Sequence, residues 1–291
     1  MNAPTAASEP RSLYWSVRRE IWENRSVWLA PLIVASVVLF ATAISTLCLP
    51  IRLRATSTPA QQHAAIVSPF SMAPAPIMFT TFFVGFIYCL DALYGERRDR
   101  SILFWKSLPV SDGTTVLAKA MIPLLILPLI ALALGIITQL VLLPFGAVGL
   151  AASGRNPGLV FREFHFFRGL PIMIYGLTVH ALWFAPIYGW FMLVSAWARR
   201  TPVLWALMPP LLISAVERIV SRTWYFMYML QYRVMGAMKE AFIFDKKGDI
   251  SSLSQLTPGR FLSAPGLWVG LVFAVACFAI AVRLRRNREP I

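Results

Sequence analysis

Charged residues are scarce in this chain, where they make up 14% of 291 residues, against about 25% in soluble domains. Apolar residues reach 58%, so the composition excludes an ordinary soluble globular protein. Acidic residues are rarer than basic ones, 13 against 27, and the formal net charge is +14. The basic residues lie between long apolar runs. This pattern places them at the cytosolic edges of a membrane and favours anionic lipids, not nucleic acid, as their partners.

Cysteine is also rare. Cys48, Cys89 and Cys277 lie far apart, each in or beside an apolar run and without CxxC spacing. An odd number of cysteines at such positions excludes a disulfide framework and a zinc site. We therefore expect small buried hydrophobic side chains and no metal site.

Sequence motifs for catalysis are missing. No G-x-x-x-x-G-K-[ST] run is present to cradle phosphates, and neither HExxH nor GxSxG occurs. The three histidines, His63, His165 and His180, are scattered along the chain. We expect no catalytic residue and no cofactor in this chain, and hence no ATP hydrolysis by it alone.

What the chain has in abundance is long apolar segments. A membrane-crossing helix needs about 20 mostly apolar residues, and six segments satisfy this: about Val27 to Leu49, Phe70 to Leu93, Thr115 to Phe145, Leu170 to Ala198, Pro202 to Val216 and Pro265 to Val282. The first run is too long for a secretory signal and is interpreted as a retained span. The fifth is the weakest, because Pro209-Pro210 interrupts it and Glu217 closes it early; it reads as a kinked span or a re-entrant piece.

These segments predict an all-α membrane protein with six transmembrane helices. We expect the chain to be organised as a cytosolic N-terminal tail with an amphipathic helix (1–26), a transmembrane domain (27–283) and a basic cytosolic tail (284–291). Lys and Arg are denser on the side of the termini, so both ends are expected in the cytosol of a multi-pass plasma (inner) membrane protein.

The segments between the spans differ in character. Residues 12–25 combine aromatic rings and arginines, with Tyr14, Val17, Ile21 and Trp28 at helical spacing, which favours a helix lying in the headgroup plane over a solvated leader. The stretch from Pro50 to Pro69 is polar and expected to be loop, and residues 154–158 form a turn cluster. The segment 218–264 is too long for a plain connection, and its aromatic residues predict short external helices that dip into the outer leaflet.

The loop after the second span is the most informative stretch. From Asp91 to Asp112 it begins with charged residues and continues with an apolar body that must end near Pro109. Ser111 or Asp112 then caps the next helix. A short amphipathic helix over about 96–108, between two spans, requires either a lipid surface or a protein groove.

This loop resembles the one between the second and third spans of type-2 ATP-binding cassette (ABC) exporter permeases. There, too, an acidic and basic cluster leads into an apolar helix that ends in Leu-Pro-Val-Ser, here Leu108-Pro109-Val110-Ser111. The six spans, the amphipathic N-terminal helix and the long segment before the last span agree with that family. The chain departs from it at Asp99-Arg100-Ser101, where the family often has an acidic-Gly-Thr step.

The resemblance implies a permease that forms a dimer, which we expect to be a homodimer. The dimer would bind two copies of a separate ATPase subunit, and that subunit would hold ATP and Mg. The loop helix would be the coupling helix that sits in a groove of the ATPase. Its ionic contacts would come from Glu96, Arg97, Arg98 and Asp99, and its apolar anchor from Ile102, Leu103, Trp105 and Leu108. The cargo would be an amphipathic or hydrophobic molecule such as a peptide, antibiotic, drug or lipid, exported with energy from the partner's ATP.

Polar side chains within the spans are few. His180 and Gln139 are candidates for polar contacts along a pathway, and packing inside the bundle is the alternative for both. Two other classes of function stay open at this stage: an intramembrane enzyme that uses His180 and carboxylates at the membrane edge, and a membrane scaffold without transport.

Overall fold

The computed structural model describes residues 9–55, 58–107, 110–164, 166–243 and 252–287, and within these ranges it is helical, without a β-strand. Six helical stretches are long and apolar enough to cross a membrane, which confirms an all-α membrane protein with six spans. They are α2 (Ser26–Leu47), α4 to α6 (Pro59–Met72, Pro74–Asp91, Tyr94–Arg98), α8 to α9 (Asp112–Met121, Leu127–Ala152), α11 (Phe166–Trp197), α12 (Pro202–Ser221) and α15 (Pro265–Asn287). The shorter helices are α1 (Glu9–Glu23), α3 (Leu49–Ala55), α7 (Ser101–Lys106), α10 (Leu159–Glu163), α13 (Tyr225–Ala241), η2 (Leu253–Gln255) and α14 (Pro258–Ser263).

Proline affects two spans differently. Between α8 and α9 the chain forms a π-helical turn, η1 (Ile122–Ile126), that contains Pro123. Proline has no N–H and its ring crowds the preceding turn, so the wider π pattern lets the helix continue past it. In α12 the helix runs through Pro209 and Pro210 to Ser221, and Glu217 does not close it. The fifth span is therefore longer than the sequence predicted.

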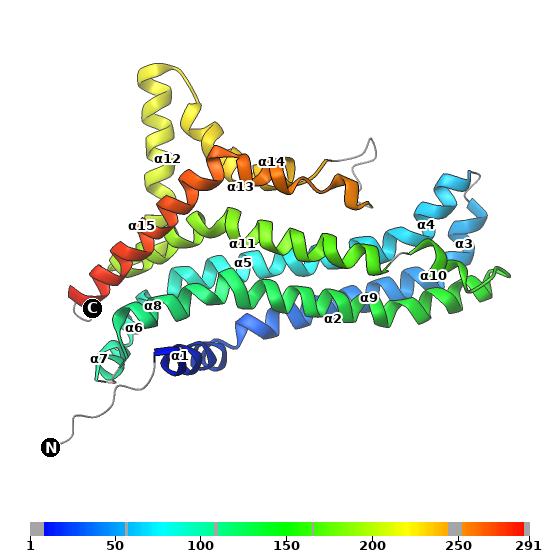
Figure 1. The fold of residues 1–291 in the computed structure, drawn as a ribbon, viewed down its shortest axis with the longest axis horizontal. Coiled ribbons are helices and arrows are strands. Elements are labelled where there is room, and N and C mark those ends of the chain that lie inside the picture. The colour runs from blue at the N-terminus through cyan, green and yellow to red at the C-terminus, as the bar shows by residue number, and fades with distance from the viewer. Residues whose placement is uncertain (1–8, 56–57, 108–109, 165, 244–251, 288–291) are drawn as a thin grey trace.

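Helices α2, α5, α9 and α11 run alongside one another in a bundle, and α15 packs against α11 (Figure 1). At one end, called here the α1 end, α1 packs on α8 and reaches α6 and α7 through Arg19, and α15 packs on α8 as well. The opposite end carries α3, α4 and α10. Figure 1 shows α1 nearly end-on, whereas the bundle helices run from side to side across the picture, so α1 lies across the end of the bundle.

The three largest of the five apolar clusters among the described residues hold the bundle together. At the α1 end, Val27, Tyr88 and Met192 join neighbouring helices. At the opposite end, Phe70 packs with residues of α3, α9 and α10. The third cluster surrounds Trp183 and fixes α13 and α14 against α11 and α15.

The prediction of a loop from Pro50 to Pro69 was wrong. The chain there forms α3 and most of α4, with the Thr58 side chain accepting a hydrogen bond from the Gln61 backbone N–H at the start of α4. Polar residues of this stretch such as Arg52, Gln61 and His63 are exposed, whereas Leu53 and Ile66 are buried in the cluster at that end of the bundle. The expected turn after the third span is present, with Gly154 at φ +69°.

Helix α12 leaves the bundle and stands across its direction (Figure 1). Its contact with the bundle is made near its start, where the Trp190 Nε1–H donates to the carbonyl of Ala206 at 3.0 Å. Most of its apolar side chains are exposed from Val203 to Val220. Helix α13 occupies much of the predicted external segment, and its placement in the outer leaflet stays a prediction.

Helix α1 differs from the expected face in two respects. It ends at Glu23, so Trp28 belongs to α2 and not to the same helix face. Val17 and Ile21 pack toward the bundle, whereas Tyr14 is exposed together with Trp15 and Trp22. The Arg18 guanidinium lies over both indole rings, at 5.2 and 5.3 Å from their centroids. This outward aromatic and basic surface suits a lipid headgroup layer.

Candidate functional site

The candidate site is the α1 end of the bundle, where the loop after the second span folds back on the spans. The Ser195 hydroxyl of α11 accepts hydrogen bonds from the backbone N–H groups of Leu93 and Tyr94, at 3.0 and 2.9 Å. These two groups start α6 and have no partner within that helix. Arg100, at φ +57°, then turns the chain from α6 into α7.

A buried ionic network underlies this loop; it consists of Arg19, Glu20, Glu96, Asp112, Lys119 and Arg285. Lys119 of α8 lies at its centre and is 3% exposed. Its ammonium is 2.9 Å from Glu20 Oε1 and 3.2 Å from Glu96 Oε1. One lysine therefore joins α8 to both α1 and α6.

Arg285 closes the network from the last span. Its Nη2 donates to Glu96 Oε2 at 2.9 Å and its Nη1 donates to Asp112 Oδ1 at 2.6 Å. Arg285 is 4% exposed, and both of its partners lie in other helices. The three basic and three acidic groups of the network balance in charge, which compensates part of the cost of removing them from water.

Glu20 is the most deeply buried acid of the network, at 0% exposed. Burial raises the pKa of this carboxyl, but the Lys119 ammonium and hydrogen bonds from Arg19, Lys119 and Tyr88 lower it more, so its net pKa lies below the ordinary value. The Tyr88 hydroxyl donates to Glu20 Oε2 at 2.8 Å. Nearby Glu23 is half-exposed and behaves oppositely, because burial raises its pKa and the Arg19 charge only partly offsets this.

Arg97 fixes α6 to the end of α11. Its Nη2 donates to the carbonyl oxygens of Ser195, at 3.0 Å, and of Ala198. Those carbonyls are among the last of the helix, which lack partners within it. A guanidinium at a helix C-terminus also interacts favourably with the helix dipole. Arg97 is 3% exposed, so it acts within the protein.

The outward side of the loop carries a different set of residues. Arg98 and Asp99 are exposed and pair with each other at 2.9 Å, and this contact lowers the pKa of Asp99. Leu103 and Phe104 of α7 are each 60% exposed. They form an apolar tip, named here the α7 tip, at the α1 end of the molecule.

Trp105 and Ile102 hold α7 in place. Ile102 is 2% exposed and belongs to the interior. The Arg19 guanidinium covers the Trp105 ring at 3.8 Å from its centroid, which is a favourable cation–π geometry. Helix α1 therefore contacts α7 directly, through the same arginine that pairs with Glu20.

Seven of the eight residues assigned to a coupling helix divide into three groups. Glu96, Arg97 and Ile102 point inward and contact the protein itself; Trp105 is half-buried under Arg19; Arg98, Asp99 and Leu103 face outward. Leu108 lies outside the described residues. The helix expected over residues 96–108 is divided into α6 and α7. The residues available to a partner are therefore Arg98, Asp99, Leu103 and Phe104.

His180 and Gln139, the two candidates for polar contacts along a pathway, are both buried. His180 Nε2 lies 3.1 Å from the Tyr188 hydroxyl, and the His180 ring packs against Phe82 and Phe184. Gln139 Nε2 donates to the Phe70 carbonyl at 3.3 Å. Both are satisfied inside the bundle. Among the described residues, no three His, Cys, Asp or Glu side chains are placed to hold a metal ion.

Sequence reasoning missed the network. Lys119 and Arg285 were counted only among the basic residues of the cytosolic segments, and Glu20 was assigned no partner. Lys119 alone could have indicated a buried acidic partner, because a lysine at the start of an apolar span needs an acid or water beside it. Which acid it meets depends on contacts 99 residues away in the chain.

Comparison with known proteins adds no relative. No family model, no characterised protein and no solved structure matches this chain.

Proposed function

We propose that this chain is the membrane-spanning subunit of an ABC-type exporter, driven by ATP hydrolysis in a separate subunit. What supports the proposal is one relationship at the α1 end: the exposed α7 tip is attached to a loop that is tied to four other parts of the bundle. Glu96 connects α6 to α8 and α15, and Arg97 connects it to α11. Arg19 of α1 lies on the Trp105 ring of α7.

Such connections suit a device that transmits movement. A displacement of α7 by a partner would be carried by charged groups to the bases of the third, fourth and sixth spans. Buried ion pairs allow little slippage, because separating them leaves uncompensated charges. The α7 tip itself, with two exposed apolar side chains flanked by Arg98 and Asp99, has the composition of a small protein contact with an apolar centre and a charged rim.

In this proposal the α1 end is cytosolic, both termini lie in the cytosol of the plasma (inner) membrane, and two copies of the ATPase subunit bind the α7 tips of a dimer. The exposed apolar face of α12 from Leu207 to Val220 is where we place the second permease copy. The exported cargo would be amphipathic or hydrophobic, since the described spans contain few charged groups apart from those at their ends.

The test is purification of the full chain from its native membrane in mild detergent, with identification of what accompanies it. We expect a stoichiometric soluble subunit that carries a Gly-rich phosphate-binding loop. Leu103→Ala combined with Phe104→Ala should release it, because these substitutions remove exposed apolar contacts without touching the ionic network. Trp105→Ala is less informative, since it also removes the surface on which Arg19 rests.

A matched control removes exposed aromatic surface from α1 at the same end of the molecule. Tyr14→Ala with Trp22→Ala should leave the soluble subunit bound. A chain that always purifies alone, or loses its partner equally with both variant pairs, would contradict the proposal. Copurification with a protein lacking nucleotide-binding motifs would instead support the scaffold alternative.

A further inference from the structure

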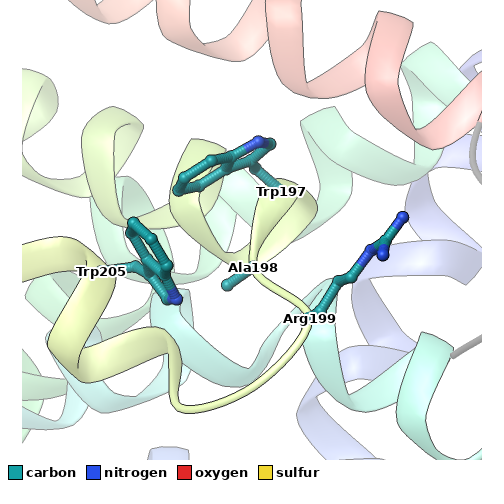
Figure 2. Close-up of a pocket in the computed structure, with 4 residues that line it drawn as sticks. All are labelled: Trp197, Ala198, Arg199 and Trp205. Carbon is teal, nitrogen blue, oxygen red and sulfur yellow. The ribbon is translucent and has the colours of Figure 1, made fainter.

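A cleft of about 290 Å³ lies where α11 ends and α12 begins. Trp197, Ala198, Arg199 and Trp205 line it (Figure 2). The two indole rings meet edge to face, with centroids 4.8 Å apart. Figure 2 shows the indoles on one side of the connecting loop and Arg199 on the other, with Ala198 between them. The cleft is therefore apolar on one side and cationic on the other.

The basic side chains of this loop are available to a ligand. Arg199 and Arg200 are both exposed, and within the part of the chain that the structure describes neither side chain forms an ion pair or a hydrogen bond. This contrasts with Arg97, Lys119 and Arg285 nearby, which are buried against acids or carbonyls. Arginine binds phosphate through two parallel hydrogen bonds, whereas an indole accepts apolar groups at the membrane edge.

The loop that shapes the cleft is short and constrained. Only residues 198–201 join the two helices. Thr201 has φ +43°, a left-handed conformation that is unfavourable for a β-branched residue, and Pro202 fixes the first residue of α12. A constrained loop holds the cleft open before a ligand arrives, which reduces the entropy lost on binding.

Size and position restrict the ligand. Pockets for whole drug-sized molecules occupy roughly 300–1,000 Å³, so this cleft admits a headgroup and the beginning of a chain. It lies at the end of the fourth span and the start of the fifth, the level at which lipid headgroups meet a spanning helix. Arg97 donates to the Ala198 carbonyl, so a ligand in the cleft rests against the same turn that anchors α6.

We propose that this cleft binds the anionic headgroup of a membrane phospholipid. The phosphate contacts Arg199, which lines the cleft, and the adjacent exposed Arg200 adds positive charge beside it; the start of the acyl chains lies against Trp197 and Trp205. This inference is independent of the exporter proposal, because it requires neither an ATPase partner nor transport.

The test uses the purified full-length chain in detergent, titrated with phosphatidylglycerol or phosphatidylcholine and followed by native mass spectrometry. Phosphatidylglycerol should bind more tightly than phosphatidylcholine. Arg199→Gln with Arg200→Gln should weaken phosphatidylglycerol binding about tenfold or more through loss of charge-assisted hydrogen bonds. The matched control is Arg25→Gln, another exposed arginine at the α1 end and far from the cleft in sequence, which should change binding little.

Two further arms decide the identity of the ligand. Trp205→Leu should weaken binding of the lipid while Trp28→Leu, at a similarly exposed tryptophan, should not. Glycerol phosphate alone should compete poorly, because it lacks the chains that contact the indoles. Equal loss in Arg25→Gln, equal binding of both lipids, or full competition by glycerol phosphate would each overturn the proposal. If Trp205→Leu fails to fold, the arginine variants, both on the surface, still decide it.

Discussion

Lys119 and Glu20 form a buried ion pair, with the ammonium nitrogen 2.9 Å from a carboxylate oxygen, although 99 residues separate them in the chain. Glu20 belongs to a helix that lies across the end of the bundle, and Lys119 to the base of the third span. The pair therefore decides where α1 sits on the bundle. An apolar contact alone would allow α1 to slide or rotate, since apolar contacts are not directional.

Removal of the central lysine should strongly destabilise the protein. Lys119→Met leaves Glu20 and Glu96 buried without their shared cation, and the loss of one partner from a buried pair costs about 3–5 kcal/mol. We expect a clear fall in Tm in detergent, measured by the unfolding of the purified chain. Lys106→Met, at an exposed lysine of α7, is the control. Adding Glu20→Gln to Lys119→Met should restore part of the loss, and a double variant less stable than Lys119→Met would argue against the pair.

Acid should loosen α1. The pKa of Glu20 is lower in the folded protein than its ordinary value of 4.5, so its contribution to stability is complete above that pH and is lost as pH falls through the lower, folded-state value. Glu20→Gln should therefore flatten the decline of Tm at acidic pH. Glu23 has a raised pKa and favours folding as it takes up a proton, so Glu23→Gln should make the decline steeper. Identical pH profiles for the two variants would contradict these assignments.

Arg97 and Arg98 are adjacent but have different roles, which provides a matched comparison. Arg97→Met removes hydrogen bonds to the Ser195 and Ala198 carbonyls, and each bond from a charged donor is worth about 1.5–3 kcal/mol. Tm should fall. Arg98→Met removes an exposed pair with Asp99 and should leave Tm unchanged. Similar thermal stability of the two variants would show that Arg97 does not anchor α6.

Glycine permits close contact between the first and third spans. A Cβ at Gly149 would overlap the backbone oxygen of Thr46, so Gly149→Ala must push α9 away from α2, at a cost of about 1–3 kcal/mol. Gly169 of α11 has open space around it. Gly169→Ala should leave Tm unchanged or raise it, because alanine favours the helix by up to about 1 kcal/mol. The measurement is thermal unfolding of both variants in the same detergent. An undiminished Tm in Gly149→Ala would contradict the close contact between α2 and α9.

The spans could be predicted from the sequence, because a run of apolar residues long enough to cross a bilayer is a local property. The start of α8 is local too: Ser111 was one of two expected caps, and its hydroxyl accepts from the Thr114 N–H at 3.0 Å. The helices between Pro50 and Pro69 were missed because their few apolar residues become informative only once α9 is beside them.

The candidate site was harder to predict for a related reason. The pattern of residues 96–108 indicated an amphipathic helix, but it did not reveal that Glu96 faces Lys119 and Arg285, or that Arg97 faces α11. A charged residue near a membrane edge has the same local signature whether it faces water or a buried partner. Only the packing of distant helices distinguishes these outcomes. That packing buries Glu96, Arg97 and Ile102, and it leaves Arg98, Asp99, Leu103 and Phe104 as the outward surface.

The network also sets an order on biosynthesis. Arg285 is 189 residues downstream of Glu96 and lies in the last turn of the sixth span, so all six spans must be in place before that salt bridge can form. Until then, Glu96 and Asp112 lack the guanidinium that holds them in the finished protein. Docking of the last helix is therefore the step that completes the α1 end, and a chain cut short before Arg285 would leave Asp112 without its guanidinium and Glu96 with only Lys119 and Arg19 as cationic neighbours.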